Sequence, residues 1–394
     1  MAVTLDQDRR ERRRVTRARE LTLHATILAV AVWSAVLADV ASPGPLGRFS
    51  GFQKGNDFVQ FYVAGSLARD GEYAALVDAA GFGRAQAPYL PPGAAVSFPP
   101  VYGPQIALFF APFTWMPYLA AYAAWSAVTI AAIVWAAWIC RRMAPALRPW
   151  TRPTLAVTAA YPPFAYLVLD GQISAIAVTA LTLTGTALER QRRVLAGAAL
   201  GVLGCKLSLL VPALAVCVIA QEWILAGTAL LVAILQLALA APVVGMDVVA
   251  AYVHNALSFA KQPDLLSRSP YLMASWRTFW ASLLPERAAW MLYAVTAAAS
   301  VGVAAWGWRT TDDPLRRLGL LSIAIALASP HLYLYDLVVL VPAFVASAAV
   351  LVDARALALR WSTYLAFLSP LAVPLAAFTG IQPITIVLAV WLVT

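Results

Sequence analysis

Residues 118–139 read YLAAYAAWSAVTIAAIVWAAWI, an apolar run without a single charged side chain. A helix of about 20 apolar residues is long enough to cross a bilayer. Similar runs recur along the whole chain, which is 62% hydrophobic and 12% charged, with a mean hydropathy of +0.75. The runs are continuous and rich in Ala, Leu and Val, whereas a membrane β-barrel would need short alternating strands. The sequence therefore predicts an all-α polytopic membrane protein.

Outward from this run, the chain divides into apolar spans and two polar regions, 42–98 and 245–286. The first polar region is long and Gly/Pro-rich, which favours a catalytic loop over a bare connector. We expect a basic tail, 1–20, followed by a single transmembrane domain, 21–394. The predicted spans are 21–41, 101–116, 118–139, 153–169, 172–188, 194–220 as one long or two short helices, 223–243, 287–308, 317–330, 332–352, 361–378 and 380–394.

The net charge of +9 comes from arginines that cluster between the apolar runs. Short basic loops stay on the cytoplasmic side of a membrane, so these clusters predict a cytoplasmic N-terminus and place region 42–98 outside. Because the charges flank spans, we expect membrane lipids and not nucleic acid as partners. The clusters are seven arginines within 9–19, then Arg141/Arg142, Arg190/Arg192/Arg193, Arg309/Arg316/Arg317 and Arg355/Arg360.

Two segments do not fit simple crossings. Two full crossings after the outer loop would put Arg141 and Arg142 outside, so either 101–116 crosses halfway or the charge rule fails here. Pro112 and Pro117 are consistent with a short or broken helix. Further on, a hairpin that dips to Lys206 and returns would leave both ends of 194–220 in the cytoplasm, and we prefer this interpretation.

Three glycines, Gly197, Gly201 and Gly204, lie three or four residues apart in an apolar run. No strand precedes them and no phosphate-loop lysine follows, so we interpret them as a surface that lets two helices approach closely. The three cysteines and three histidines are too scattered for a metal site, and we predict neither a metal nor a cofactor.

Asp57 is the candidate catalytic residue. It lies just outside the first span, in Gly55-Asn56-Asp57-Phe58-Val59-Gln60-Phe61-Tyr62. Partial burial raises the pKa of a carboxyl group, which suits proton abstraction near neutral pH. The alternative is structural: Asp57 caps a helix that begins at Phe58.

The order of four motifs resembles that of glycosyltransferase family 87, the polyprenol-phosphate-sugar-dependent transferases of the GT-C superfamily, which include mycobacterial mannosyltransferases that make phosphatidylinositol mannosides. Together they cover about residues 55 to 215, and the later Ser329-Pro330 fits more loosely. The motifs are Asp57-Phe58 followed by Phe61-Tyr62-x-Ala64-Gly65; Phe98-Pro99-Pro100; Asp170-Gly171-Gln172-Ile173; and Ala196-Gly197 leading to Cys205-Lys206-Leu207 and Pro212.

The resemblance implies a GT-C-type fold with roughly 10–13 transmembrane or re-entrant helices and extracytoplasmic loop helices near 42–98 and 245–286. It implies transfer of a sugar, mannose in the best-known members, from a polyprenyl-phosphate donor to a lipid or glycan hydroxyl, with inversion and with Asp57 as the base. With an Ala/Arg-rich, Lys-poor composition, it also suggests the inner membrane of a bacterium, with the active site on the extracytoplasmic face.

For the donor phosphate, the candidates are Lys206, Lys261, Arg268 and Arg277. Lys206 lies inside an apolar run, where a charge is a functional hypothesis by default. Its alternative is a lysine that snorkels or pairs with Asp170 or Asp336, while Lys261 and Arg268 fit solvated loop charges equally well.

The other candidates are polar residues in or near the motifs. Arg69 shares a face with Asp57 if 58–69 forms a surface helix. Carboxylate, amide and tyrosine side chains give directional hydrogen bonds to sugar hydroxyls, although capping is an equally ordinary role. The complete set of predicted substrate-binding residues is Tyr62, Arg69, Tyr102, Gln172, Lys206, Lys261, Arg268, His331, Tyr335 and Asp336.

Two other classes of protein remain as alternatives. A transporter or flippase for a lipid-linked or small solute would also show intramembrane charge and broken helices. A noncatalytic assembly subunit would tolerate replacement of Asp57. The long outer loop that carries Asp57, and the lack of a clear internal repeat, favour the enzyme.

Overall fold

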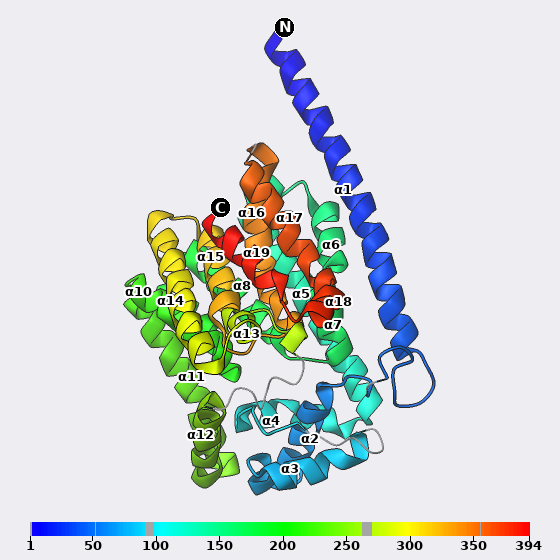
Figure 1. Ribbon diagram of the computed structural model, residues 1–394, viewed down its shortest axis with the longest axis vertical. Helices are drawn as coiled ribbons and strands as arrows, with labels where there is room; N and C mark the ends of the chain where they lie inside the picture. Colours follow the sequence, from blue (N-terminus) through cyan, green and yellow to red (C-terminus); the bar gives the residue numbers. More distant parts are fainter. Residues whose placement is uncertain (1, 52, 91–97, 262–269, 355) are drawn as a thin grey trace.

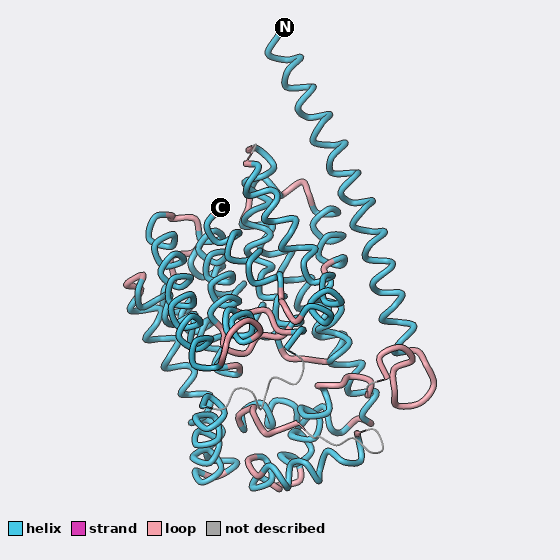
Figure 2. The backbone as a smooth tube through the Cα atoms, viewed as in Figure 1, coloured by secondary structure: helices cyan, strands magenta, loops and turns pink. Residues whose placement is uncertain are grey.

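The computed structural model describes residues 2–51, 53–90, 98–261, 270–354 and 356–394. Most of this part is helical, and its extended pairings are two isolated bridges, Leu46 with Gln53 and Met273 with Tyr333 (Figure 2). Six segments are long and apolar enough to cross a membrane, which confirms the all-α polytopic prediction. They are Ala18–Val40, Tyr118–Met143, Trp223–Val244, Glu286–Thr310, Leu334–Val352 and Leu357–Thr379.

Four of these segments belong to single long helices: α1 (Ala2–Val40), α5 (Tyr118–Met143), α11 (Trp223–Val244) and α14 (Glu286–Thr310). Each of the other two segments consists of successive shorter helices. A proline in the first turn of each later helix removes a backbone donor, so the preceding helix does not continue. Their parts are η8 (Leu334–Leu340) with α16 (Val341–Asp353), and α17 (Leu357–Leu368) with η9 (Ser369–Ala372) and α18 (Val373–Thr379).

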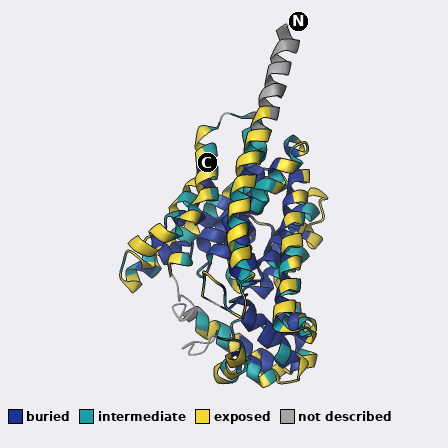
Figure 3. Ribbon diagram, turned by 90° about the vertical axis from the view of Figure 1, so that its right-hand side faces the viewer, coloured by how far each residue is buried: buried dark blue, intermediate teal, exposed yellow. Residues whose placement is uncertain are grey.

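Helix α1 lies on the outside of the bundle and packs against α6 (Thr151–Ala160) and α7 (Pro162–Asp170). The indole nitrogen of Trp33 donates to the Ala159 carbonyl at 2.9 Å. Leu23, Val30 and Leu37 are exposed, as expected for side chains that face lipid (Figure 3). The helix starts at Ala2, so the basic segment continues into the first span and projects beyond the bundle (Figure 1).

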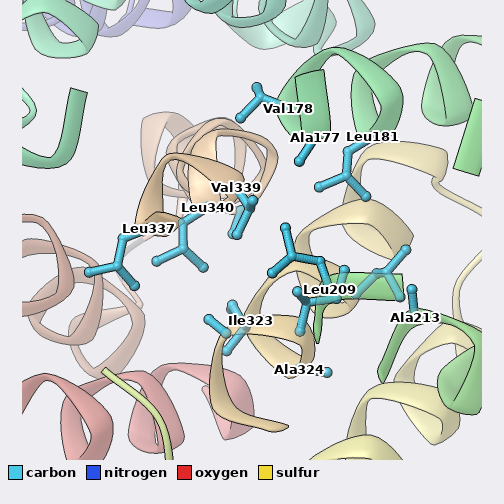
Figure 4. Close-up of a cluster of buried hydrophobic side chains, with 14 of the residues drawn as sticks. Ala177, Val178, Leu181, Leu209, Ala213, Ile323, Ala324, Leu337, Val339 and Leu340 are labelled. Atoms are coloured by element: carbon cyan, nitrogen blue, oxygen red, sulfur yellow. The ribbon is translucent and has the colours of Figure 1, made fainter. Parts of the chain in front are cut away.

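The core is formed where α8 (Ser174–Glu189), α10 (Leu207–Ile219), α15 (Pro314–Ala328) and η8 meet. Leu181, Leu209 and Val339 are fully buried there (Figure 4). Helix α19 (Pro383–Val393) packs against α15 and α17. These elements form a packed bundle, and the loops lie at its two ends.

Segment 194–220 forms the predicted hairpin. Helix α9 (Arg193–Gly201) and η5 (Val202–Cys205) lead to Lys206, whose φ of −142° and ψ of 82° break the helix before α10 begins. At the opposite end, Arg193 Nη1 lies 3.7 Å from Glu222 Oε2. Both ends of the segment therefore lie at the same end of the bundle, and the two-short-helix interpretation is correct.

Segment 101–116 is too short to cross a bilayer, because it consists of α4 (Pro104–Phe110) and η3 (Ala111–Trp115). The end of α5 packs beside the start of α15, where Cys140 and Ala144 share a cluster with Leu315. Glu222 also lies 4.0 Å from Arg317. The loops after α5, α8, α10 and α14, with η4 (Pro145–Leu147), therefore share one end, which we call the arginine end.

The glycine interpretation is confirmed. A Cβ atom at Gly197 would lie 2.6 Å from the Leu225 carbonyl oxygen, and one at Gly201 would lie 2.5 Å from that of Ala229. Helices α9 and α11 thus pack with their backbones in close approach, as small residues permit.

At the end opposite the arginine end, parts of the two polar regions fold into a packed helical cap (Figure 1). Ten of the twelve residues of α2 (Phe58–Arg69) are buried. Asn255 of α12 (Met246–Lys261) donates to the Val77 carbonyl at 2.8 Å, which joins the two regions. The other cap elements are η1 (Tyr73–Leu76), α3 (Ala79–Gln86) and η2 (Ala87–Tyr89), whereas η7 (Pro270–Leu272) and α13 (Trp276–Ala281) pack against the bundle helices α18 and α14.

Candidate active site

Asp57 is the N-cap residue of α2, but its side chain does not cap the helix. The turn before it is fixed by Gly55, with φ of 64°, and by Tyr118, whose hydroxyl donates to the Gly55 carbonyl at 2.9 Å. Asp57 Oδ2 instead accepts a hydrogen bond of 2.7 Å from Gln172 Nε2. The capping alternative for this carboxylate is therefore wrong.

Gln172 reaches Asp57 because the chain turns tightly at Gly171, between α7 and α8. Gly171 has φ of 67°, and a Cβ atom there would lie 2.6 Å from Cβ of Phe58. The Trp125 indole holds the same turn by donating to the Gly171 carbonyl at 3.1 Å. Only glycine fits both the left-handed conformation and this close approach.

Tyr102 and Tyr335 complete the surroundings of Gln172. The Tyr102 hydroxyl donates to Gln172 Oε1 at 3.2 Å, and Gln172 Nε2 donates to the Tyr335 hydroxyl at 3.2 Å. Tyr335 also forms a hydrogen bond with the Asp57 carboxylate. The structure thus brings together three predicted residues around Asp57.

A buried ion pair lies beside this network. Lys206 Nζ is 2.5 Å from Asp336 Oδ1, and the Lys206 and Asp336 side chains are 8% and 0% exposed. Ser174 donates to Asp336 and lies 3.3 Å from Lys206 Nζ. Asp336 Oδ2 accepts from the Tyr333 amide at 3.1 Å. Of the alternatives for Lys206, pairing with Asp336 is the one observed.

His331 lies near the ion pair, and Arg277 lies near His331. The Ala274 amide donates to the Leu332 carbonyl at 2.9 Å, which places α13 beside the segment that carries His331. Burial, together with the positive charges of Lys206 and Arg277, lowers the pKa of His331 to about 4, so its imidazole is neutral at pH 7. Arg277 is buried, and its guanidinium lies 5.1 Å from the centre of the Trp290 ring.

Asp57 combines deep burial with a neutral hydrogen-bond donor. Burial raises the pKa of its carboxyl group above the usual value, while hydrogen bonds from Gln172 and Tyr335 and the charge of Lys206 act in the opposite direction. The net result is a raised pKa. Such a carboxylate is a stronger base than an exposed aspartate and accepts a proton nearer to neutral pH.

The predicted residues that stay apart from this site are Arg69 and Tyr62. Arg69 is at the far end of α2, where its guanidinium pairs with Asp70 at 2.8 Å and donates to the Thr114 carbonyl at 2.7 Å. Residues 58–69 form a buried helix and not the expected surface helix, and the substrate-binding role of Arg69 stays a prediction. The Tyr62 hydroxyl donates to the Met116 carbonyl at 2.9 Å. Arg268 and the side chain of Lys261 lie outside the described residues.

Two residues near the site were missing from the predicted set. Ser174 joins the ion pair, and Asp170 lies close enough to Asp57 for the two carboxylates to repel each other. Their signal was present in the sequence, because both flank the Gly171-Gln172 pair that had already been noted.

The fold and this site define a multi-pass membrane protein with a buried carboxylate at the end opposite the arginine end. The family model for Glycosyltransferase family 87 matches residues 101–330, more than half of the chain. The chain belongs to this family, and the protein is a membrane glycosyltransferase. No curated protein and no solved structure matches it. The matched range includes Gln172 and Lys206, but it begins after Asp57 and ends before His331.

Proposed function

We propose that the protein transfers a sugar, with mannose as the first candidate, from a polyprenyl-phosphate donor to a lipid or glycan hydroxyl on the extracytoplasmic face of a bacterial inner membrane. The observation that carries this proposal is Asp57, a buried carboxylate held by the neutral amide of Gln172 at 2.7 Å. Family membership supports sugar transfer and argues against the transporter alternative. The donor class follows from the motif resemblance.

In the proposed reaction, Asp57 takes the proton of the acceptor hydroxyl. The acceptor oxygen then attacks the anomeric carbon from the side opposite the phosphate, so the new glycosidic bond forms with inversion. The bond between the anomeric carbon and the phosphate oxygen breaks, and polyprenyl phosphate leaves with both electrons. The raised pKa of Asp57 supports this role, since a general base works best when its pKa is near the operating pH.

For the leaving phosphate, the candidates are Arg277 and Lys206. Arg277 lies on α13 beside the segment that carries His331, and Lys206 Nζ lies 2.5 Å from Asp336 Oδ1. A guanidinium forms bidentate hydrogen bonds with phosphate oxygens. His331 Nδ1 is buried and has no hydrogen-bond partner among the described residues, so a neutral imidazole is available there for a substrate hydroxyl.

The test uses purified protein in detergent, radiolabelled polyprenyl-phosphate mannose and a crude lipid-acceptor extract. Wild type is compared with Asp57→Asn, which preserves the shape of the side chain. We expect transfer by wild type and its loss in a folded Asp57→Asn variant. If the variant still transfers the sugar, the protein is a glycosyltransferase but Asp57 is not its base.

The same assay tests the sugar and the class of protein. If mannose is not transferred, a panel of other lipid-linked sugars separates a wrong donor from a wrong reaction. Failure with the whole panel, together with movement of a lipid-linked sugar across vesicles, would reject the proposed reaction in favour of transport.

A further inference from the structure

The amide of Gln172 has no hydrogen-bonding capacity left for a substrate. Its nitrogen donates to Asp57 Oδ2 at 2.7 Å and to the Tyr335 hydroxyl at 3.2 Å. Its oxygen accepts from the Tyr102 hydroxyl at 3.2 Å and from the Ile173 amide at 3.1 Å. A glutamine side chain has two donors and two acceptor positions, and all four are occupied. Since the residue is also only 2% exposed, it does not fit the substrate-binding role predicted from the sequence.

Two residues further on, Ser174 serves the other carboxylate. Its hydroxyl donates to Asp336, and the same hydroxyl lies 3.3 Å from Lys206 Nζ. Segment 172–174 therefore contacts both buried acids from the start of α8. Asp57 receives a neutral amide, while Asp336 receives the lysine and the hydroxyl.

This division has a chemical consequence. A cation in direct contact with a carboxylate strongly stabilises the charged form and so lowers the pKa of the carboxyl group. A neutral hydrogen-bond donor lowers the pKa by a smaller amount. Lys206 is held on Asp336 at 2.5 Å and above the Tyr335 ring, at 5.2 Å from its centre. The lysine is therefore kept from pairing directly with Asp57.

We infer that Gln172 is a positioning residue that fixes the Asp57 carboxylate with a neutral amide, while Ser174 helps to hold Lys206 on Asp336, so that Asp57 stays oriented and is not paired directly with a cation. This inference rests on the proposed function, in which Asp57 is the base. It assigns Gln172 a role in the orientation and protonation of Asp57 and none in direct contact with the sugar.

The test replaces Gln172 with methionine, which keeps the length of the side chain but removes its hydrogen bonds. The matched control is Gln236→Met, because the Gln236 amide also donates a hydrogen bond, to the Gly201 carbonyl at 2.8 Å, but lies outside the site. Titration of Asp57 is followed by pH-difference infrared spectroscopy. The carboxyl band that is present in wild type and absent in Asp57→Asn is assigned to Asp57. This measurement requires no substrate.

Loss of a hydrogen bond to the charged form raises the pKa of a carboxyl group, so we expect the Asp57 midpoint in Gln172→Met to move up by about one pH unit. The acid limb of the transfer rate should move by the same amount, with the KM for donor nearly unchanged. The other titratable and charged groups that face Asp57 are unchanged in this variant. They are Tyr102, Tyr118, Asp170, Lys206, Tyr335 and Asp336.

Three outcomes decide the inference. An unchanged midpoint in Gln172→Met, or an equal shift in Gln236→Met, would overturn it. A rise in the KM for donor without a shift of the Asp57 midpoint would overturn it too, because that result would show that Gln172 binds the substrate. If Gln172→Met does not fold, Gln172→Glu takes its place; the added acid should also raise the Asp57 midpoint. Failure of the proposed function would appear separately, as absent transfer by wild type with an intact infrared shift.

Discussion

At the scale of single residues, the site separates two carboxylates that have similar burial and different partners. Asp57 is held by an amide and a tyrosine, and Asp336 is held by a lysine, a serine and a backbone amide. Buried charges require such partners, since an isolated ion in a dry interior is unstable. The groups that contact a buried carboxylate therefore determine whether it can act as a base or has a structural role.

Replacement of Asp57 by asparagine should lower kcat by about 10²- to 10⁴-fold, which is the usual contribution of a general base. The asparagine oxygen can still accept from Gln172, so the thermal midpoint in detergent should change little. Steady-state rates and a melting curve on the same preparation test both parts. A large loss of stability alongside the loss of rate would assign Asp57 a structural role.

The wild-type rate should fall as pH decreases, because a general base must be ionised to act. Burial raises the pKa of Asp57, so the fall should begin at a higher pH than for an exposed aspartate. A pH profile of kcat measured in one buffer series at constant ionic strength checks this. A rate that stays flat down to the pKa of a free aspartate would contradict it.

At the scale of elements, the broken hairpin brings charge into the bundle. Lys206 lies where η5 ends and α10 begins, and its bond to Asp336 fastens this break to η8. Removing one member of a buried pair typically costs about 3–5 kcal/mol, since the other charge is left uncompensated.

Lys206→Met should therefore destabilise the protein by about that amount. The double variant Lys206→Met/Asp336→Asn should recover most of the loss, because the asparagine is neutral and its oxygen still accepts from the Tyr333 amide. Thermal or denaturant unfolding in detergent measures both. If the double variant is as unstable as the single one, the pair is not the source of the loss.

The contact between α9 and α11 gives a second prediction. A Cβ atom at Gly201 would lie 2.5 Å from the Ala229 carbonyl oxygen, whereas one at Gly227, on α11, would meet no atom within 4 Å. Gly201→Ala should destabilise the protein by roughly 1–3 kcal/mol through overpacking. Gly227→Ala should be neutral or slightly stabilising, because alanine favours helix. Equal melting temperatures would show that the helices can separate without cost.

At the scale of the whole molecule, the arginine loops gather at one end and the carboxylate site lies at the other. Arginine-rich loops stay on the cytoplasmic side, which supports an extracytoplasmic site. The native cysteines are buried, so single exposed cysteines can report on topology.

Glu72 and Gln191 are both exposed, at the site end and the arginine end respectively. In intact cells, a membrane-impermeant maleimide should label Glu72→Cys and not Gln191→Cys. After permeabilisation it should label both. The opposite pattern would place the active site in the cytoplasm.

The sequence by itself determined the class of protein and indicated the break at Lys206, and it left open whether 101–116 crosses halfway. Hydrophobicity, proline and charge act locally, so they can be read along the chain. The packing role of Gly197 and Gly201 was readable for the same reason.

Only the tertiary structure decided which polar residues work together. Asp57, Gln172 and Tyr335 are separated by 115 and 163 residues along the chain and meet through hydrogen bonds. Helical spacing suggested that Arg69 and Asp57 share a face of a surface helix, but α2 is buried in the cap and Arg69 at its far end bonds to Thr114. The free energy of a buried charge depends on the partners that the fold brings to it, and no local pattern records those partners.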